Sequence, residues 1–239
     1  MLTKQISWRQ LVAERGGGSS AVATRSPIFL VVDDHDAVLQ CLLPILRSTY
    51  PEACLLAAQD CQTARQQIER YRPDLIILDL ELPEVLGKTP GCKAGLDLLK
   101  TVMQIEPASN ILVMGASVSP LVRLRSEIYR YPAGFTAADK TQPVPTVLKL
   151  LDLALRKSIY LPPEVRSRPE LKPQWLTLLT LKFQAGLSDK AIASAMDVST
   201  RTLRSYWLCI QDTLGIYDDP NKDLRVQIEL AARQAGLID

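Results

Sequence analysis

The sequence predicts an α/β domain with a parallel sheet, followed by a smaller all-α domain. In the first part of the 239 residues, short apolar runs alternate with helix-length amphipathic stretches. This pattern implies parallel strands joined by crossover helices. A proline-rich segment follows, and beyond it no stretch has the pattern of a strand. The chain is 47% hydrophobic and 23% charged, as expected of a globular protein rather than a disordered one.

The predicted strands and helices follow one another in strict alternation. We expect buried strands at 28–32, 54–58, 75–79, 111–114 and 133–136. We expect the helices that follow them at 36–49, 61–70, 95–106, 119–131 and 146–157. Because crossovers between parallel strands are right-handed, few topologies remain. The commonest for five such units is the flavodoxin-like (βα)5 order 2-1-3-4-5.

Composition predicts the domain boundaries. Residues 1–26 are expected to be an N-terminal extension, since GGGSS at 16–20 is typical of a flexible linker. The α/β domain is expected at 27–158 and a linker at 159–170, where prolines accumulate. The all-α domain is expected at 171–239.

Cysteine usage and hydropathy predict the compartment. The five cysteines are scattered and never spaced C-x-x-C, which favours free thiols in a reducing cytosol over disulfides or zinc. No apolar run approaches the roughly 20 residues that span a bilayer. We therefore expect a cytoplasmic protein without membrane contact.

Three carboxylates are expected at one edge of the sheet. Asp33 and Asp34 follow the first strand, and Asp79 ends the third. Ligands of parallel sheets bind outside the carboxyl ends of the strands, and three like charges in one cleft are unfavourable without a cation. A hard divalent ion with oxygen ligands, Mg²⁺ for preference, would resolve this conflict. The alternative is three solvated acids that act as helix N-caps.

Residues 186–216 have the spacing of a helix-turn-helix. Ser188 and Ser199 are typical N-caps of two successive helices, with a tight turn at 197–198 between them. Ala193 is small where the two helices must cross closely. A plain helical hairpin without DNA contacts is the alternative.

Motifs in the α/β domain carry a resemblance to a known family. They are VVDDHD at 31–36, DLIILDLELP at 74–83 and a lysine after the fifth strand. With these motifs, residues 28 to about 157 resemble the receiver domain of two-component signalling. The resemblance implies that a sensor histidine kinase is a partner and that Mg²⁺ is the cofactor. It also implies three sets of residues: Asp79 for phosphorylation; Asp34, Asp79 and the backbone carbonyl of Glu81 for Mg²⁺; and Asp33 to complete the acidic pocket.

Several positions depart from the receiver pattern. Gly115 stands where receivers usually carry Thr or Ser, and Ser117 is the nearest substitute. Lys140 follows the strand-five aromatic, Phe135, by five residues instead of three, so we expect it to be displaced. The loop at 84–94 is longer than usual. These departures predict weak coupling between phosphorylation and output.

The all-α domain also carries a resemblance. The string LKPQWL…GLSDKAIASAMDVSTRTLRSYWLCIQDTLGI…ARQAGLI resembles the output domain of NarL/FixJ (LuxR-type) regulators over nearly all of 171–238. It implies that the second helix of the helix-turn-helix enters the major groove. Asp212, an acid where a phosphate contact is common, predicts weaker and more salt-sensitive binding. The implied DNA-contacting residues are Lys190, Thr200, Arg201, Arg204 and Ser205.

Taken together, the resemblances imply a LuxR-type two-component response regulator that binds DNA as a homodimer and regulates transcription. The alternative is a protein-interaction adaptor that keeps both folds but neither binds DNA nor responds to phosphate. An enzyme has little support, because His35 is the single histidine and no nucleophile–base pair or nucleotide loop is present.

Overall fold

The computed structural model describes residues 25–166, 171–216 and 222–239. Most of the predicted extension at 1–26 and part of the predicted linker at 159–170 lie outside these ranges. No helix within the described ranges is long and apolar enough to cross a membrane.

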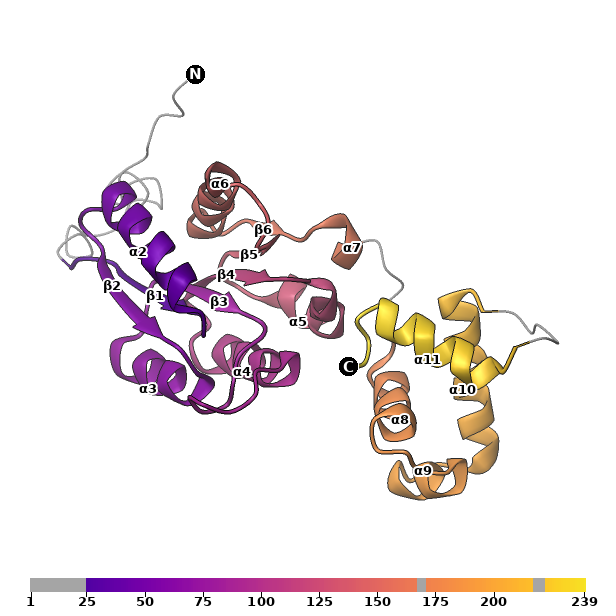
Figure 1. The fold of residues 1–239 in the computed structure, drawn as a ribbon. Helices are drawn as coiled ribbons and strands as arrows, with labels where there is room; N and C mark the ends of the chain where they lie inside the picture. Colours follow the sequence, from indigo (N-terminus) through magenta and orange to yellow (C-terminus); the bar gives the residue numbers. More distant parts are fainter. Residues whose placement is uncertain (1–24, 167–170, 217–221) are drawn as a thin grey trace. The chain divides into compact units, whose positions relative to one another are not determined.

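Six parallel strands form a single sheet (Figure 1). Their spatial order is β2-β1-β3-β4-β5-β6. The predicted flavodoxin-like order is therefore confirmed, with one short strand added beside β5. In chain order the strands are β1 (Ile28–Val32), β2 (Cys54–Ala58), β3 (Leu75–Asp79), β4 (Asn110–Gly115), β5 (Phe135–Asp139) and β6 (Ile159–Tyr160).

Helices cover both faces of this sheet. α2 and α6 pack on one face, and α3 and α4 lie on the other (Figure 1). The helix predicted at 119–131 is divided into a 3-10 helix, η1, and a short α-helix, α5. The helices up to residue 166 are α2 (Asp36–Thr49), α3 (Cys61–Tyr71), α4 (Cys92–Ile105), η1 (Ser119–Leu124), α5 (Arg125–Arg130), α6 (Val144–Leu155) and α7 (Pro163–Arg166).

The last two strands differ from the prediction. β5 was expected at 133–136 but runs to Asp139. β6 lies in the expected linker and pairs with β5 through Phe135 opposite Ile159 and Thr136 opposite Tyr160. A strand of two residues is too short to show an alternation of apolar and polar positions, so the sequence pattern does not reveal it.

The core beneath α2 and α6 holds β1 in place. Phe29 and Val31, two residues apart on β1, pack in one apolar cluster with Leu46 of α2 and Leu151 of α6. The ring of Tyr50 meets Phe29 edge-on, with 5.3 Å between ring centroids. Full burial of one such side chain contributes about 1.5–3 kcal/mol. The strand end that carries the predicted acids is therefore anchored to a rigid core.

A close approach between α4 and the end of β3 depends on Gly95. A Cβ at this position would lie 2.0 Å from the carbonyl oxygen of Leu80, the residue after Asp79. Gly95→Ala should therefore destabilise the protein by about 1–3 kcal/mol through overpacking, although alanine favours a helix interior by about 1 kcal/mol. Urea unfolding of the full chain measures this change.

The matched control for this substitution is Gly91→Ser. Gly91 is the N-cap of α4, with extended backbone, and nothing lies within 4 Å of an added Cβ. Serine is a preferred N-cap, so this variant should be neutral or slightly more stable. A Gly95→Ala protein as stable as the wild type would show that the approach to Leu80 is not a tight constraint.

The described chain divides into two compact units. The first comprises residues 25–118 and 126–162, and the second comprises 119–125 and the described residues from 163 onward. The domain boundaries predicted from composition, 27–158 and 171–239, stay predictions.

The second unit contains the expected helix-turn-helix. Ser188 caps α9 by accepting from the backbone N–H of Ala191, and Ser199 caps α10 by accepting from that of Thr202. Asp197, between them, adopts a left-handed conformation with φ of 53°. A single apolar core joins the helices and includes buried side chains from all four of them, Trp207 among these. These helices are α8 (Pro173–Phe183), α9 (Asp189–Ala195), α10 (Thr200–Leu214) and α11 (Leu224–Gln234).

Candidate functional site

The predicted acids converge at the carboxyl edge of the sheet. β1 and β3 are adjacent parallel strands with Val32 opposite Leu78, which brings the next residues, Asp33 and Asp79, close together. Both are buried, at 3% and 2% exposure. One ligand atom from each of Asp33, Asp34, His35 and Asp79 lies within 4.8 Å of the others. We call these four residues the acidic pocket.

Lys140 enters this pocket, which corrects the prediction that it is displaced. Its Nζ lies 2.7 Å from Asp33 Oδ2 and 2.7 Å from Asp79 Oδ2. The spacing from Phe135 was misleading, because Phe135 is fully buried at the start of β5, far from its carboxyl end. Asp139, at that end, is opposite Gly115, and Lys140 follows directly.

Burial and hydrogen bonds act in opposite directions on Asp79. Burial raises the pKa of its carboxyl group, while hydrogen bonds from Lys140 and from the backbone N–H of Glu81 lower it; the net pKa is raised. For Lys140, burial lowers the pKa, but its bonds to Asp33 and Asp79 outweigh this and the pKa is raised. The pocket is thus a partly neutralised anionic site with one fixed ammonium group.

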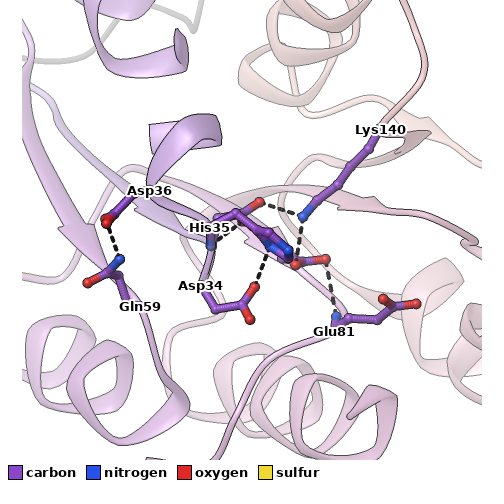
Figure 2. Close-up of polar contacts among 8 residues, drawn as sticks. Asp34, His35, Asp36, Gln59, Glu81 and Lys140 are labelled. Atoms are coloured by element: carbon purple, nitrogen blue, oxygen red, sulfur yellow. Dashed lines mark hydrogen bonds and ion pairs between the residues drawn. The ribbon is translucent and has the colours of Figure 1, made fainter. Parts of the chain in front are cut away.

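Glu81 contributes its backbone rather than its carboxylate. Its N–H donates to Asp79 Oδ1 at 3.1 Å. Its own carboxylate points away from the pocket (Figure 2).

The carboxylate oxygens of the pocket fit a hard divalent cation. Asp33 Oδ1 accepts from the backbone N–H of His35 at 3.0 Å. Asp34 Oδ1 is buried and lies 2.7 Å from Nδ1 of His35. Three carboxylates gathered in one partly buried cluster repel one another, and one ammonium group does not neutralise all three. Carboxylate oxygens at this edge would suit Mg²⁺, with Asp34, Asp79 and the carbonyl of Glu81 as the expected ligands.

The predicted switch positions lie around this edge with different exposures. Gly115 ends β4, and its carbonyl accepts from the N–H of Lys140 at 2.8 Å. Ser117 is exposed, two residues beyond the strand. The pocket side of β4 therefore has no hydroxyl at position 115 itself, and the switch roles stay predictions.

The long loop after Asp79 is folded back on α3. Leu82 and Gly91 form an antiparallel bridge at its base, and Glu84 pairs with Arg65 of α3. The backbone carbonyls of Pro83 and Glu84 accept from the first N–H groups of α3. These contacts hold the base of the loop beside the pocket.

The predicted DNA-contacting residues gather on one exposed face. Thr200, Arg201, Arg204 and Ser205 of α10 and Lys190 of α9 are all exposed. Leu203, Trp207 and Ile210, on the opposite face of α10, are buried in the core. Asp212 is exposed further along the same helix.

The sequence analysis did not predict a contact in which Arg225 of α11 stacks on Trp207 of α10. The guanidinium of Arg225 lies 3.4 Å from the centroid of the Trp207 ring, and it pairs with Asp189 of α9 at 3.2 Å. A stacked arginine over tryptophan contributes about 0.5–2 kcal/mol. No local motif signals it, because Asp189 and Arg225 are 36 positions apart.

Comparison with known proteins agrees with this architecture. The response regulator receiver domain family matches residues 29–126. The transcriptional regulatory protein YdfI of Bacillus subtilis (strain 168) is 24% identical over 223 residues, covering 87% of this chain and 96% of that protein.

Another curated relative matches only in part. The protein-glutamate methylesterase/protein-glutamine glutaminase 2 of Burkholderia thailandensis is 31% identical over 90 residues. The match covers 38% of this chain and 23% of that enzyme. The chain thus spans about a quarter of the length of this relative.

Solved structures share the fold. RcsB from Salmonella enterica serovar Typhimurium, bound to promoter rprA in the presence of phosphomimetic BeF3-, has a TM-score of 0.53 at 19% identity. That match covers 85% of this chain and 99% of RcsB. RcsB bound to promoter P1flhDC has a TM-score of 0.54 at 17% identity, covering 90% and 100%.

Proposed function

We propose that this chain, a response regulator whose receiver domain matches over residues 29–126, is phosphorylated on Asp79 and regulates transcription through DNA binding by α10. The observation that carries the proposal is the environment of Asp79. It is a buried carboxylate at a strand end, oriented by the N–H of Glu81 and paired with Lys140. The likeness to a transcriptional regulatory protein over 96% of that protein's length supports the output.

In the proposed reaction, an oxygen of Asp79 attacks the phosphorus of a phosphodonor, and the donor's leaving group departs with the electrons of the broken P–O or P–N bond. Lys140 is already 2.7 Å from this carboxylate and would pair with an oxygen of the phosphoryl group. Asp34, Asp79 and the carbonyl of Glu81 would hold Mg²⁺, which would supply positive charge to offset the negative charge of the phosphoryl oxygens.

The proposed output is sequence-dependent binding of DNA in the cytoplasm. The exposed face of α10 would enter the major groove, with Arg201 and Arg204 one turn apart. Lys190 would contact the phosphate backbone. The proposed partners are a sensor histidine kinase and a second copy of the chain, since two half-sites read more base pairs than one helix.

A DNA-binding titration of the full chain tests this proposal. Genomic fragments are titrated with and without acetyl phosphate and Mg²⁺. We expect saturable, sequence-selective binding that weakens steeply with salt. Binding to no fragment in either state would favour the adaptor function, for which the exposed acid Asp212 on the DNA-facing helix is the specific observation.

Coupling of phosphorylation to DNA affinity should be weak, because position 115 lacks a hydroxyl. We expect phosphorylation to change the affinity of the wild type by less than about tenfold, or 1.4 kcal/mol, and Gly115→Thr to enlarge that change. An added Cβ would lie 3.1 Å from the carbonyl oxygen of Ser117, so residues 116–117 must shift slightly.

The control for this variant is Gly115→Ala, which adds the Cβ without the hydroxyl. Fluorescence anisotropy with phosphorylated and unphosphorylated protein measures the coupling. If alanine and threonine enlarge it equally, the effect comes from the shifted loop and not from a hydroxyl contact.

A further inference from the structure

The ring of His35, the single histidine of the chain, lies against those carboxylate oxygens of Asp33 and Asp34 that Lys140 does not bind. His35 Nδ1 is 2.7 Å from Asp34 Oδ1 and 3.4 Å from Asp33 Oδ1. Figure 2 shows the ring of His35 turned toward the carboxylate of Asp34. The sequence motif DDH contains this arrangement, but the predicted ligand set used only oxygen atoms.

We propose that His35 is a nitrogen ligand of the divalent ion in this pocket, and that it shifts the preference of the site from Mg²⁺ toward a first-row transition ion such as Mn²⁺. This inference rests on the proposed metal site and specifies its selectivity. It adds one residue to the expected ligands, Asp34, Asp79 and the carbonyl of Glu81.

The spacing of the donor atoms suits one octahedral ion. Metal–ligand distances of about 2.1 Å place neighbouring ligand atoms about 3 Å apart and opposite ones about 4.2 Å apart. The distances from His35 Nδ1 to the two aspartates, 2.7 and 3.4 Å, bracket the neighbouring value. The ligand atoms of Asp34, His35 and Asp79 lie within 4.8 Å of one another, so small rotations of these side chains would bring them onto one ion.

The ammonium group of Lys140 leaves this side of the pocket open to a cation. Lys140 binds the Oδ2 atoms of Asp33 and Asp79. His35 faces the Oδ1 atoms of Asp33 and Asp34. Asp34 Oδ1 is the oxygen nearest to the imidazole, and Lys140 does not bind it.

His35 contributes to the start of α2 through its backbone and not through its side chain. His35 is the N-cap of α2, and its carbonyl accepts from the N–H groups of Val38 and Leu39. Its ring makes no capping hydrogen bond. The start of α2 therefore positions the imidazole beside Asp34, and the ring is not needed to cap the helix.

The chemistry of the donor set determines the preferred ion. Sites with carboxylate and carbonyl ligands alone suit Mg²⁺, whereas imidazole nitrogen binds the ions from Mn²⁺ to Zn²⁺ more strongly. A mixed set of carboxylates and one imidazole therefore raises the affinity for Mn²⁺ more than that for Mg²⁺. Removing the imidazole should therefore lower the affinity for Mn²⁺ more than the affinity for Mg²⁺.

The test compares Mn²⁺ and Mg²⁺ binding to the full chain and to its His35→Gln variant by calorimetric titration. The Mn²⁺ affinity should fall by at least about tenfold, since loss of even an outer partner of a metal ligand costs that much. The Mg²⁺ affinity should fall much less. In pulsed EPR of the Mn²⁺-loaded wild type, a ¹⁴N coupling should be present, and it should disappear in His35→Gln.

Two further variants separate failure of this inference from failure of the metal site. Asp36→Asn removes an acid that binds Gln59 at 2.7 Å instead of facing the pocket, and it should leave both affinities unchanged. Asp34→Asn should weaken both ions. If both ions bind and depend on Asp34, while His35→Gln changes neither their ratio nor the EPR spectrum, His35 is only a neighbour and the inference is wrong. If neither ion binds the wild type, the proposed metal site fails and the inference fails with it.

Discussion

Replacing Asp79 by Asn is expected to abolish phosphorylation by acetyl phosphate. The two residues have nearly the same shape, so the change removes the nucleophilic oxygen and its negative charge while leaving the packing at the end of β3 intact. Asp79 is 2% exposed and held between the N–H of Glu81 and the ammonium of Lys140. Among the described residues, no other carboxylate both accepts from the N–H of Glu81 and pairs with Lys140. Intact-protein mass spectrometry after incubation with acetyl phosphate and Mg²⁺ measures the incorporation.

Asp36→Asn is the matched control, because Asp36 is an aspartate two positions after Asp34 that binds Gln59 rather than Lys140. This variant should incorporate one phosphoryl group as the wild type does. Peptide mapping of the wild-type adduct should place the group on Asp79. A mass gain that persists in Asp79→Asn would show that another carboxylate is the acceptor.

Loss of both Arg201 and Arg204 is expected to reduce DNA affinity by more than tenfold. Both side chains are exposed on the N-terminal part of α10, opposite the buried Leu203 and Trp207. A bidentate contact from arginine to a guanine edge is worth about 1–3 kcal/mol, and its loss relaxes specificity at one base pair. A phosphate contact instead affects all sequences alike, and its loss lowers the salt slope by about one.

Single substitutions to alanine, measured by fluorescence anisotropy at two salt concentrations, distinguish these two kinds of contact. Arg233→Ala is the control, since this arginine is also exposed but pairs with Glu229 on α11. It should bind as the wild type does. Unchanged affinity in both Arg201→Ala and Arg204→Ala would remove α10 from the interface and favour the adaptor function.

The acidic pocket was predictable from the sequence to the extent that it depends on where strands end. An apolar run that ends in acids, at Asp33–Asp34 and again at Asp79, specifies both a buried strand and a polar strand end. Because parallel strands share their carboxyl edge, these acids had to meet once the strands were adjacent. The helix caps Ser188 and Ser199 were predictable for a similar reason, since a cap acts on N–H groups two or three residues away.

The contacts of Lys140 could not be obtained in this way. Its distance from Asp79 depends on the pairing of β5 with β4, in which Asp139 is opposite Gly115. Counting residues from Phe135 placed this aromatic residue near the carboxyl end of β5, whereas Phe135 begins the strand and Asp139 ends it. The selectivity proposed for His35 depends similarly on the rotation of its ring toward Asp34, which the motif DDH alone does not specify.

The sequence by itself determined most of the segments that form strands and helices, where the acids leave the sheet and which face of α10 is polar. These properties depend on periodicity and on neighbours along the chain. Only the tertiary structure decided that Lys140 binds two carboxylates, that β6 extends the sheet and that Arg225 stacks on Trp207. Each of these depends on strand register or helix packing between residues distant in the chain, which a local pattern does not encode.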